Sequence, residues 1–90
     1  MKNLKKEEYK RMDEIRKEVE NFIVENTGTD ITEIDMQHSF EEYEIDSILL
    51  IKLIVYMEEK FSISYQEKIL LEEYSTIKDF VVYTHSLLLK

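Results

Sequence analysis

The sequence predicts an all-α fold, a small four-helix bundle of three main helices and one short helix. First, there is one glycine and no proline among 90 residues, which leaves few residues for the tight turns of a sheet. Second, apolar residues recur every three or four positions in separate segments, the spacing of one helix face. Third, an irregular stretch over residues 28–46 predicts a long loop between the first two helices. At this length, residues 1–90 are expected to form one domain.

The first helix is expected to run from about residue 5 to Glu25 or Asn26. Its apolar stripe consists of Met12, Ile15, Val19, Phe22 and Ile23. Gly28 follows at the position where a left-handed residue commonly ends a helix. Residues 1–11 form a basic extension of this helix, ahead of the stripe.

The loop over residues 28–46 has scattered apolar residues, so we expect it to be pinned to the bundle, with a short helical turn near Ile31 to Ile34. The second helix begins at Asp46 or Ser47, both of which are good N-cap residues. It continues to about Lys60.

The second helix is apolar on two faces. One stripe consists of Leu50, Leu53, Ile54, Met57 and Phe61, and the other of Ile48, Ile51 and Val55. We expect the first stripe to be core, with Leu53, Met57 and Phe61 packed together with Phe22 and Phe80. A helix that is apolar on more than one face lies centrally in a core or presents an apolar patch to a partner.

A short third helix is expected from Gln66 to Glu73, and a fourth from Ser75 or Thr76 to the C-terminal end. The fourth helix has Ile77, Phe80, Val81, Thr84 and Leu88 at helical spacing. Thr76 and Asp79 resemble a capping box, with Asp in place of the usual Glu.

The formal net charge of -8 is unevenly distributed. Residues 18–51 contain ten acidic residues and no Lys or Arg. Such a surface repels phosphates, so we expect no nucleic-acid partner. Basic protein surfaces are the expected partners, unless the acidity serves only solubility.

No apolar run is long enough to span a bilayer, and the N-terminus lacks the apolar core of a signal peptide. The absence of cysteine rules out disulfides and fits a cytosolic protein. We therefore expect a cytoplasmic monomer that does not bind membranes.

Ser47 is the strongest candidate for chemistry. A hydroxyl in the first turn of a helix is exposed and lies beside unpaired backbone N–H groups, where the helix dipole favours a phosphate. Taken alone, Asp46 and Ser47 are more simply explained as a helix cap and nothing more.

Further residues give this segment a context. The sequence Asp46-Ser47-Ile48 matches an Asp-Ser-Leu/Ile/Met attachment motif. Three other segments accompany it: Ser39-Phe40, Met57 to Phe61 with its Glu-Glu-x-Phe ending, and Thr76 to Phe80. In combination they resemble the family of acyl, peptidyl and D-alanyl carrier proteins, over about residues 12–88.

The resemblance implies a function. A phosphopantetheinyl transferase would attach 4'-phosphopantetheine from coenzyme A to Ser47, and its thiol would hold acyl or aminoacyl intermediates as thioesters. The chain itself would catalyse nothing. Its partners would be loading and downstream enzymes of fatty-acid, polyketide or nonribosomal-peptide type biosynthesis.

Three departures from the family pattern matter, and one of them is the basic segment at residues 1–11, which the family does not require. Glu44 stands where the family often has glycine, so the backbone of the loop is expected to differ there. Leu49 and Lys52 replace the acidic residues that usually follow the serine in fatty-acid carriers. The replacement by Leu49 and Lys52 favours a specialised polyketide or nonribosomal-peptide type pathway.

We expect Ile48, Ile51 and Val55 to form the partner-docking face, with Lys52 selecting the partner. Alternatively, the long loop could fold over these residues. The alternative function is an unmodified helical adaptor that binds a partner through the same apolar face of the second helix.

Other chemistry finds little support. His38 and His85 lack metal-site spacing and are expected to be loop and surface residues. No glycine-rich nucleophile elbow accompanies Asp46 and Ser47, so a hydrolase is not expected. Most of the six tyrosines are expected at the core edge with hydrated hydroxyls.

Overall fold

The computed structural model describes residues 5–65 and 76–89, with side chains from Lys10 onward. These residues contain three α-helices and two short 3-10 helices. In chain order they are α1 (Lys5–Thr27), η1 (Ile31–Glu33), η2 (Phe40–Tyr43), α2 (Ser47–Phe61) and α3 (Ile77–Leu88). These residues contain no strand, which confirms the all-α prediction. The short helix expected from Gln66 to Glu73 lies outside the described residues.

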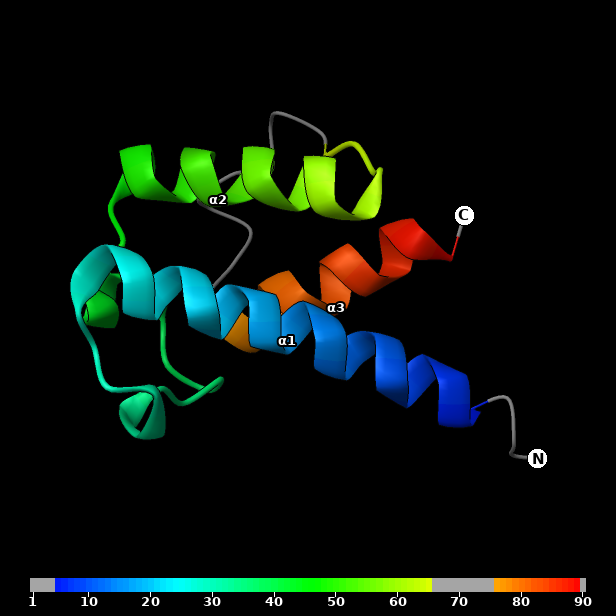
Figure 1. The fold of residues 1–90 in the computed structure, drawn as a ribbon, viewed down its shortest axis with the longest axis horizontal. Coiled ribbons are helices and arrows are strands. Elements are labelled where there is room, and N and C mark those ends of the chain that lie inside the picture. The colour runs from blue at the N-terminus through cyan, green and yellow to red at the C-terminus, as the bar shows by residue number, and fades with distance from the viewer. Residues whose placement is uncertain (1–4, 66–75, 90) are drawn as a thin grey trace.

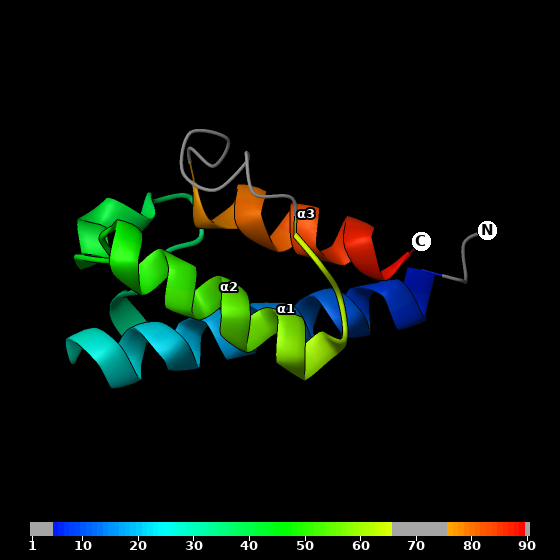
Figure 2. The same ribbon diagram turned by 90° about the horizontal axis from the view of Figure 1, so that it is seen from above.

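The helix α1 is the long axis of the molecule, and both α2 and α3 pack against it (Figure 1). The N-terminal end of α1 and the C-terminal end of α3 lie at the same end of the molecule (Figure 2). The N-terminal end of α2 lies at the opposite end, beside the two 3-10 helices (Figure 1). Residues 28–46 therefore hold the start of α2 away from the chain ends.

The end of α1 follows from its local sequence. The helix continues to Thr27, slightly beyond the predicted end, and the Thr27 hydroxyl donates to the Ile23 carbonyl at 2.7 Å. Gly28 then takes a left-handed conformation (φ 76°) and donates its N–H to the carbonyl of Val24 at 3.0 Å. This confirms the predicted glycine cap.

The core is built from the predicted apolar faces and from the loop. Its buried apolar residues are Ile15, Val19, Ile23, Phe40, Tyr43, Ile45, Leu50, Leu53, Ile54, Met57, Tyr65, Ile77, Phe80 and Val81. Three of them (Phe40, Tyr43 and Ile45) belong to the 28–46 segment, so that segment is pinned to the bundle as expected.

The prediction that Phe22 and Phe61 are core residues was wrong. Both are only partly buried and pack against the outside of the core. The ring of Phe22 instead contacts that of Tyr56, with centroids 6.4 Å apart. Helical spacing identified the inward side of each helix but not how deeply each side chain is buried.

The start of α3 is fixed from two sides. Thr76 Oγ1 accepts from the Asp79 N–H at 3.1 Å, and Asp79 Oδ2 accepts from the Thr76 N–H at 3.3 Å, which confirms the predicted capping box. Ile77 and Lys78 donate their N–H groups to carbonyls in the loop, at 2.9 and 2.8 Å. The loop therefore satisfies donors that a helix start leaves unpaired.

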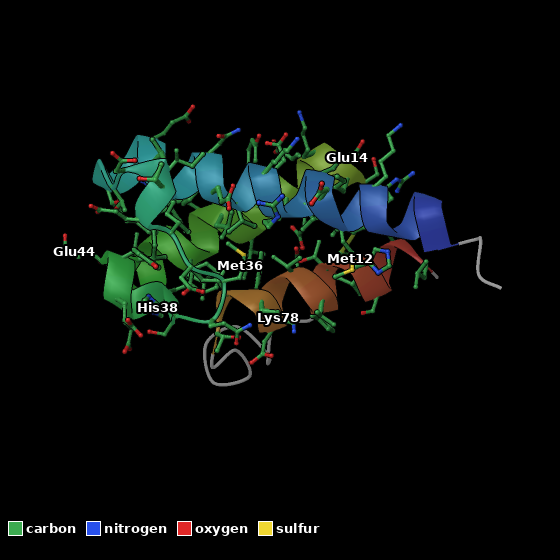
Figure 3. All side chains as sticks on the ribbon, turned by 90° about the horizontal axis from the view of Figure 1, so that it is seen from below. Met12, Glu14, Met36, His38, Glu44 and Lys78 are labelled. Carbon is green, nitrogen blue, oxygen red and sulfur yellow. The ribbon has the colours of Figure 1, made fainter. Side chains whose placement is uncertain are left out.

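Packing against the core includes a residue in the first half of α1. Met12 packs against the core, and Figure 3 shows it between α1 and α3.

Within residues 5–65 and 76–89, no helix combines the length and apolar character that a bilayer crossing requires.

Candidate functional site

The start of α2 is set by Asp46. Its backbone is extended, and its Oδ1 accepts from the Leu49 N–H at 2.9 Å, so Asp46 is the N-cap. Its carbonyl accepts from the Leu50 N–H at 2.9 Å, which is the first hydrogen bond of the helix. Ser47 is therefore the first residue inside the helix, as the sequence indicated.

Ser47 is exposed. Within the described part of the chain, no group hydrogen-bonds to its hydroxyl. It lies beside an open hollow of about 510 Å³, lined by Glu41, Glu44, Ile45, Asp46 and Ser47 itself. An incoming group can therefore approach the hydroxyl from solvent without displacing a protein contact.

Two opposing fields act on a phosphate at Ser47. The N-terminus of α2 favours a negative charge there. The carboxylates of Glu41, Glu44 and Asp46 disfavour it, although all three residues are exposed and water screens such charges strongly. Screening by water leaves this repulsion weak.

Glu44 adopts the left-handed backbone conformation, with φ 64° and ψ 28°. Its N–H donates to the carbonyl of Glu41 at 2.9 Å, so the turn closes despite the side chain. A left-handed conformation costs a non-glycine residue roughly 1–2 kcal/mol. Glu44 thus takes a conformation that glycine favours and carries the strain.

Replacing Glu44 by glycine is expected to raise the stability of the protein by about 0.5–1 kcal/mol. Relief of the strain outweighs the extra freedom that glycine gives the unfolded chain. Chemical denaturation measures the change. The matched control is Glu41→Gly, which removes the same charge from the same hollow at a residue with negative φ, and which should destabilise. If both variants lose stability equally, Glu44 is not strained.

The outer face of α2 is apolar beside Ser47. Ile48 is 65% exposed, Ile51 49% and Val55 47%. Lys52, on the same stretch of helix, is also exposed. The 28–46 loop therefore leaves these side chains open, contrary to the alternative in which it covers them.

A polar link joins this helix to α1. Tyr56 donates a short hydrogen bond to Glu18, and Lys60 lies 3.5 Å from the other oxygen of that carboxylate. The hydrogen bond to Glu18, together with burial and the charges of Glu18 and Glu25, raises the pKa of Tyr56 to about 12. The Tyr56 hydroxyl is protonated at neutral pH and donates to α1 from the side of α2 next to its exposed apolar face.

Neither of the two histidines hydrogen-bonds to the Ser47 hydroxyl. His38 is an exposed loop residue. His85 was expected on the surface but is partly buried, and its Nε2 has neither solvent contact nor a hydrogen-bond partner among the described residues. Among these residues, no cluster of three or more acidic or histidine side chains is arranged to hold a metal ion.

Comparison with protein families matched residues 17–83 to the family described as phosphopantetheine attachment site. The match covers well over half of the chain, which therefore belongs to this family, as the motifs predicted. Comparisons with curated proteins and with solved structures gave no match.

Family membership defines the cofactor and the class of function. The cofactor is covalently bound 4'-phosphopantetheine, and the chain is a phosphopantetheine-carrying carrier protein. Carrier domains of this family are generally non-catalytic and are substrates of a phosphopantetheinyl transferase. Biosynthetic enzymes are the other partners that the family implies.

The residues at the start of α2 fit such an arm. The exposed hydroxyl of Ser47 has no protein partner among the described residues, and it opens on a hollow. The sequence correctly predicted that Asp46, Ser47 and Ile48 stand at the start of a helix. It missed η2 and the left-handed turn at Glu44, which precede the serine. A sequence signal for η2 was present, because Ser39 followed three residues later by Glu42 is a capping-box pattern. No such pattern marks the turn at Glu44.

Proposed function

We propose that Ser47 is the residue to which phosphopantetheine is attached. The observation that carries the proposal is an exposed, unpaired hydroxyl in the first turn of α2, next to the N-cap Asp46. In the transfer, the Ser47 Oγ–P bond forms and the bond from that phosphorus to the adenosine bisphosphate part of coenzyme A breaks. The hydroxyl proton passes to a base supplied by the transferase.

When bound, the arm supplies a thiol that holds an acyl or aminoacyl group as a thioester. The protein presents the arm at one end of the bundle, beside the apolar face of α2. Tethering raises the effective concentration of the cargo at each enzyme that binds the carrier. We propose that residues 1–90 act as one carrier domain, which is supported by the packing of Met12 against the core.

The test is intact-mass spectrometry of the protein after incubation with coenzyme A, magnesium and a promiscuous phosphopantetheinyl transferase. A carrier gains the mass of a single phosphopantetheinyl group. An unmodified helical adaptor, which would bind a partner through the same face of α2, gains none.

We further propose that Ile48, Ile51 and Val55 form the docking face and that Lys52 helps to select the partner. The three apolar side chains are about half exposed or more and lie along the helix beside Ser47. Exposed apolar residues next to an attachment point are explained by docking. Their exposure supports this role.

The charge on the first turns of α2 also bears on the pathway that the carrier serves. Fatty-acid carriers usually have acidic residues after the serine, and here Leu49 and the exposed Lys52 occupy that stretch. A lysine repels the basic patch to which such carriers bind, and an unfavourable charge is an effective source of specificity. We infer a carrier for a specialised polyketide or nonribosomal-peptide type pathway.

Two substitutions test the docking face. Val55→Asp is expected to fold normally, because Val55 is exposed, and to lose most transfer with the native loading enzyme. Lys52→Glu should improve transfer with a fatty-acid synthase enzyme and weaken it with the native one, most clearly at low salt. Loading assays measure both effects, and circular dichroism checks the fold.

Either outcome can fail separately. Unfolding of Val55→Asp would show that the position supports the core. If Lys52→Glu changes transfer with neither enzyme, Lys52 does not select partners.

A further inference from the structure

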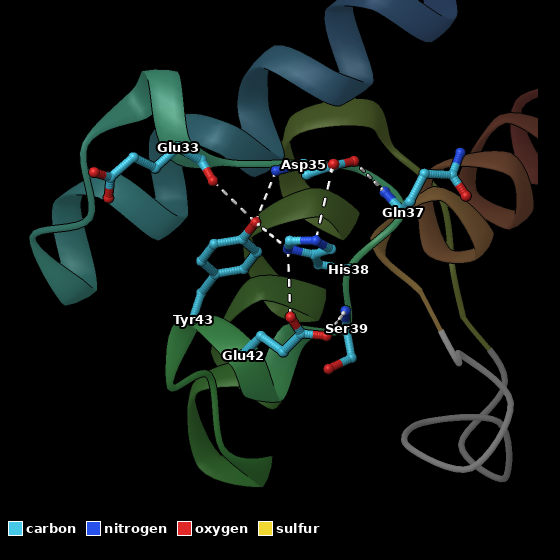
Figure 4. Close-up of polar contacts among 7 residues, drawn as sticks. All are labelled: Glu33, Asp35, Gln37, His38, Ser39, Glu42 and Tyr43. Carbon is cyan, nitrogen blue, oxygen red and sulfur yellow. Dashed lines mark hydrogen bonds and ion pairs between the residues drawn. The ribbon is translucent and has the colours of Figure 1, made fainter.

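The hydroxyl of Tyr43 is the centre of a polar cluster within the loop that leads to Ser47 (Figure 4). It accepts from the Asp35 N–H at 2.8 Å and donates to the Glu33 carbonyl at 3.1 Å. Nδ1 of His38 lies 3.0 Å away, and the two rings stack with centroids 5.9 Å apart. Tyr43 itself is buried, which corrects the expectation of a hydrated hydroxyl at the core edge.

Counting hydrogens fixes how this cluster is bonded. A tyrosine hydroxyl has one hydrogen, and a carbonyl can only accept, so the hydrogen of Tyr43 points to Glu33. His38 must then donate through Nδ1. The carboxylate of Glu42, 3.3 Å from the same nitrogen, is a second acceptor for a hydrogen there. The structure therefore assigns His38 a hydrogen on Nδ1, and its Nε2 faces the carboxylate of Asp35 at 3.9 Å.

The cluster is continuous with the attachment turn. Tyr43 is the last residue of η2, and the left-handed Glu44 follows it directly. The buried Ile45 donates its N–H to the Phe40 carbonyl at 3.1 Å, and Asp46 then caps α2. Each residue from Tyr43 to Asp46 is thus held by a side-chain or backbone hydrogen bond.

The same loop is also attached to α3. The carbonyl of His38 accepts from the Ile77 N–H, and that of Met36 accepts from the Lys78 N–H. Figure 3 shows Met36 and Lys78 close together on this side of the molecule. Tyr43 therefore connects the turn before Ser47 to a segment that α3 holds in place.

We propose that Tyr43 and His38 are positioning residues for phosphopantetheine attachment. They hold the turn in the conformation in which Asp46 caps α2 and the Ser47 hydroxyl faces solvent. The inference rests on the proposed role of Ser47, through which both residues act. Removing the Tyr43 hydroxyl leaves the Glu33 carbonyl and the Asp35 N–H without their partner and leaves Nδ1 of His38 with the Glu42 carboxylate alone, so the turn gains other conformations.

The test compares Tyr43→Phe with Tyr65→Phe. Tyr65 is equally buried, and its hydroxyl bonds to Thr84 in the core, far along the chain from the turn. Both variants are assayed with a phosphopantetheinyl transferase and coenzyme A, at a temperature where circular dichroism shows them folded. If only a fraction of molecules has a competent turn, the apparent affinity falls by that fraction. Tyr43→Phe should raise KM for the carrier about fivefold with kcat nearly unchanged, whereas Tyr65→Phe should change neither.

Hydrogen exchange supplies a readout at the turn itself. The Leu49 N–H is bonded to Asp46, so its exchange should accelerate in Tyr43→Phe and not in Tyr65→Phe. Equal behaviour of the two variants in KM and in exchange would overturn the positioning role. The role of Ser47 is tested independently in the same proteins. If both tyrosine variants still gain one arm, and adding Ser47→Ala to each abolishes it, Ser47 is the attachment site even though Tyr43 has no positioning role.

His38 is tested separately. Its ¹⁵N resonances should show a hydrogen on Nδ1, and a neutral ring with its hydrogen only on Nε2 would contradict the assignment. His38→Asn keeps an N–H donor near the Nδ1 position and should retain the wild-type KM. His38→Leu, which has no donor, should raise it as Tyr43→Phe does. If His38→Asn and His38→Leu share one KM, the donor role is wrong.

Discussion

Replacing Ser47 by alanine is expected to abolish phosphopantetheine attachment and to leave the fold almost unchanged. The substitution removes the only atom that would form the bond to phosphorus. Its effect on the fold is small because the Ser47 side chain is exposed and the helix cap is supplied by Asp46. Intact mass after transferase treatment measures the first effect, and helical circular dichroism with thermal melting measures the second.

Other serines provide the control for this result. Ser39→Ala changes a partly buried loop residue, and Ser62→Ala an exposed one, neither in the first turn of an α-helix. Both variants should be modified as wild type is. A Ser47→Ala protein that still gains the arm would refute the assignment.

Truncation of Phe80 to alanine is expected to give the largest loss of stability. Phe80 is fully buried and packs edge-on against Phe40 and face-on against Tyr65, with ring centroids 5.5 Å apart in both pairs. Removing a buried aromatic ring costs about 3–5 kcal/mol. That is a large part of the roughly 5–15 kcal/mol that stabilises a typical domain. Urea denaturation gives the free energy of unfolding.

Phe61 is the matched control, since it is the same residue type at the rim of the core. Phe61→Ala should cost clearly less than Phe80→Ala. If Phe80→Ala does not fold, Phe80→Leu, which leaves a smaller cavity, gives the comparison. Equal losses at the two positions would mean that the core is not centred on Phe80.

The helices and caps could be predicted because their signals are local. The stripe of α1, the glycine after it and the Thr76 capping box all depend on residues within a few positions of one another. Asp46 and Ser47 were likewise readable as a helix start, because a cap needs only its own first turn. These features place the serine at the start of α2 without knowledge of the tertiary structure.

The loop could not be predicted in the same way. Its conformation depends on pairs such as Tyr43 with the Glu33 carbonyl, ten residues apart, and on backbone contacts between Met36 and α3. No periodic pattern marks such contacts. The left-handed Glu44 is still less visible, because glycine is the residue that normally signals this conformation. Helical spacing also does not predict how deeply a side chain is buried. Phe22 lies on the predicted inward stripe of α1 and is only partly buried.

The attachment of phosphopantetheine to Ser47 is tested most directly by mapping the modified residue in the wild-type protein. The measurement is fragmentation mass spectrometry of proteolytic peptides after modification by a phosphopantetheinyl transferase. The structure predicts one arm, on the peptide that contains Ser47 and on its hydroxyl. An arm on any other serine, or an unmodified Ser47 in a protein whose intact mass has increased, would contradict the account.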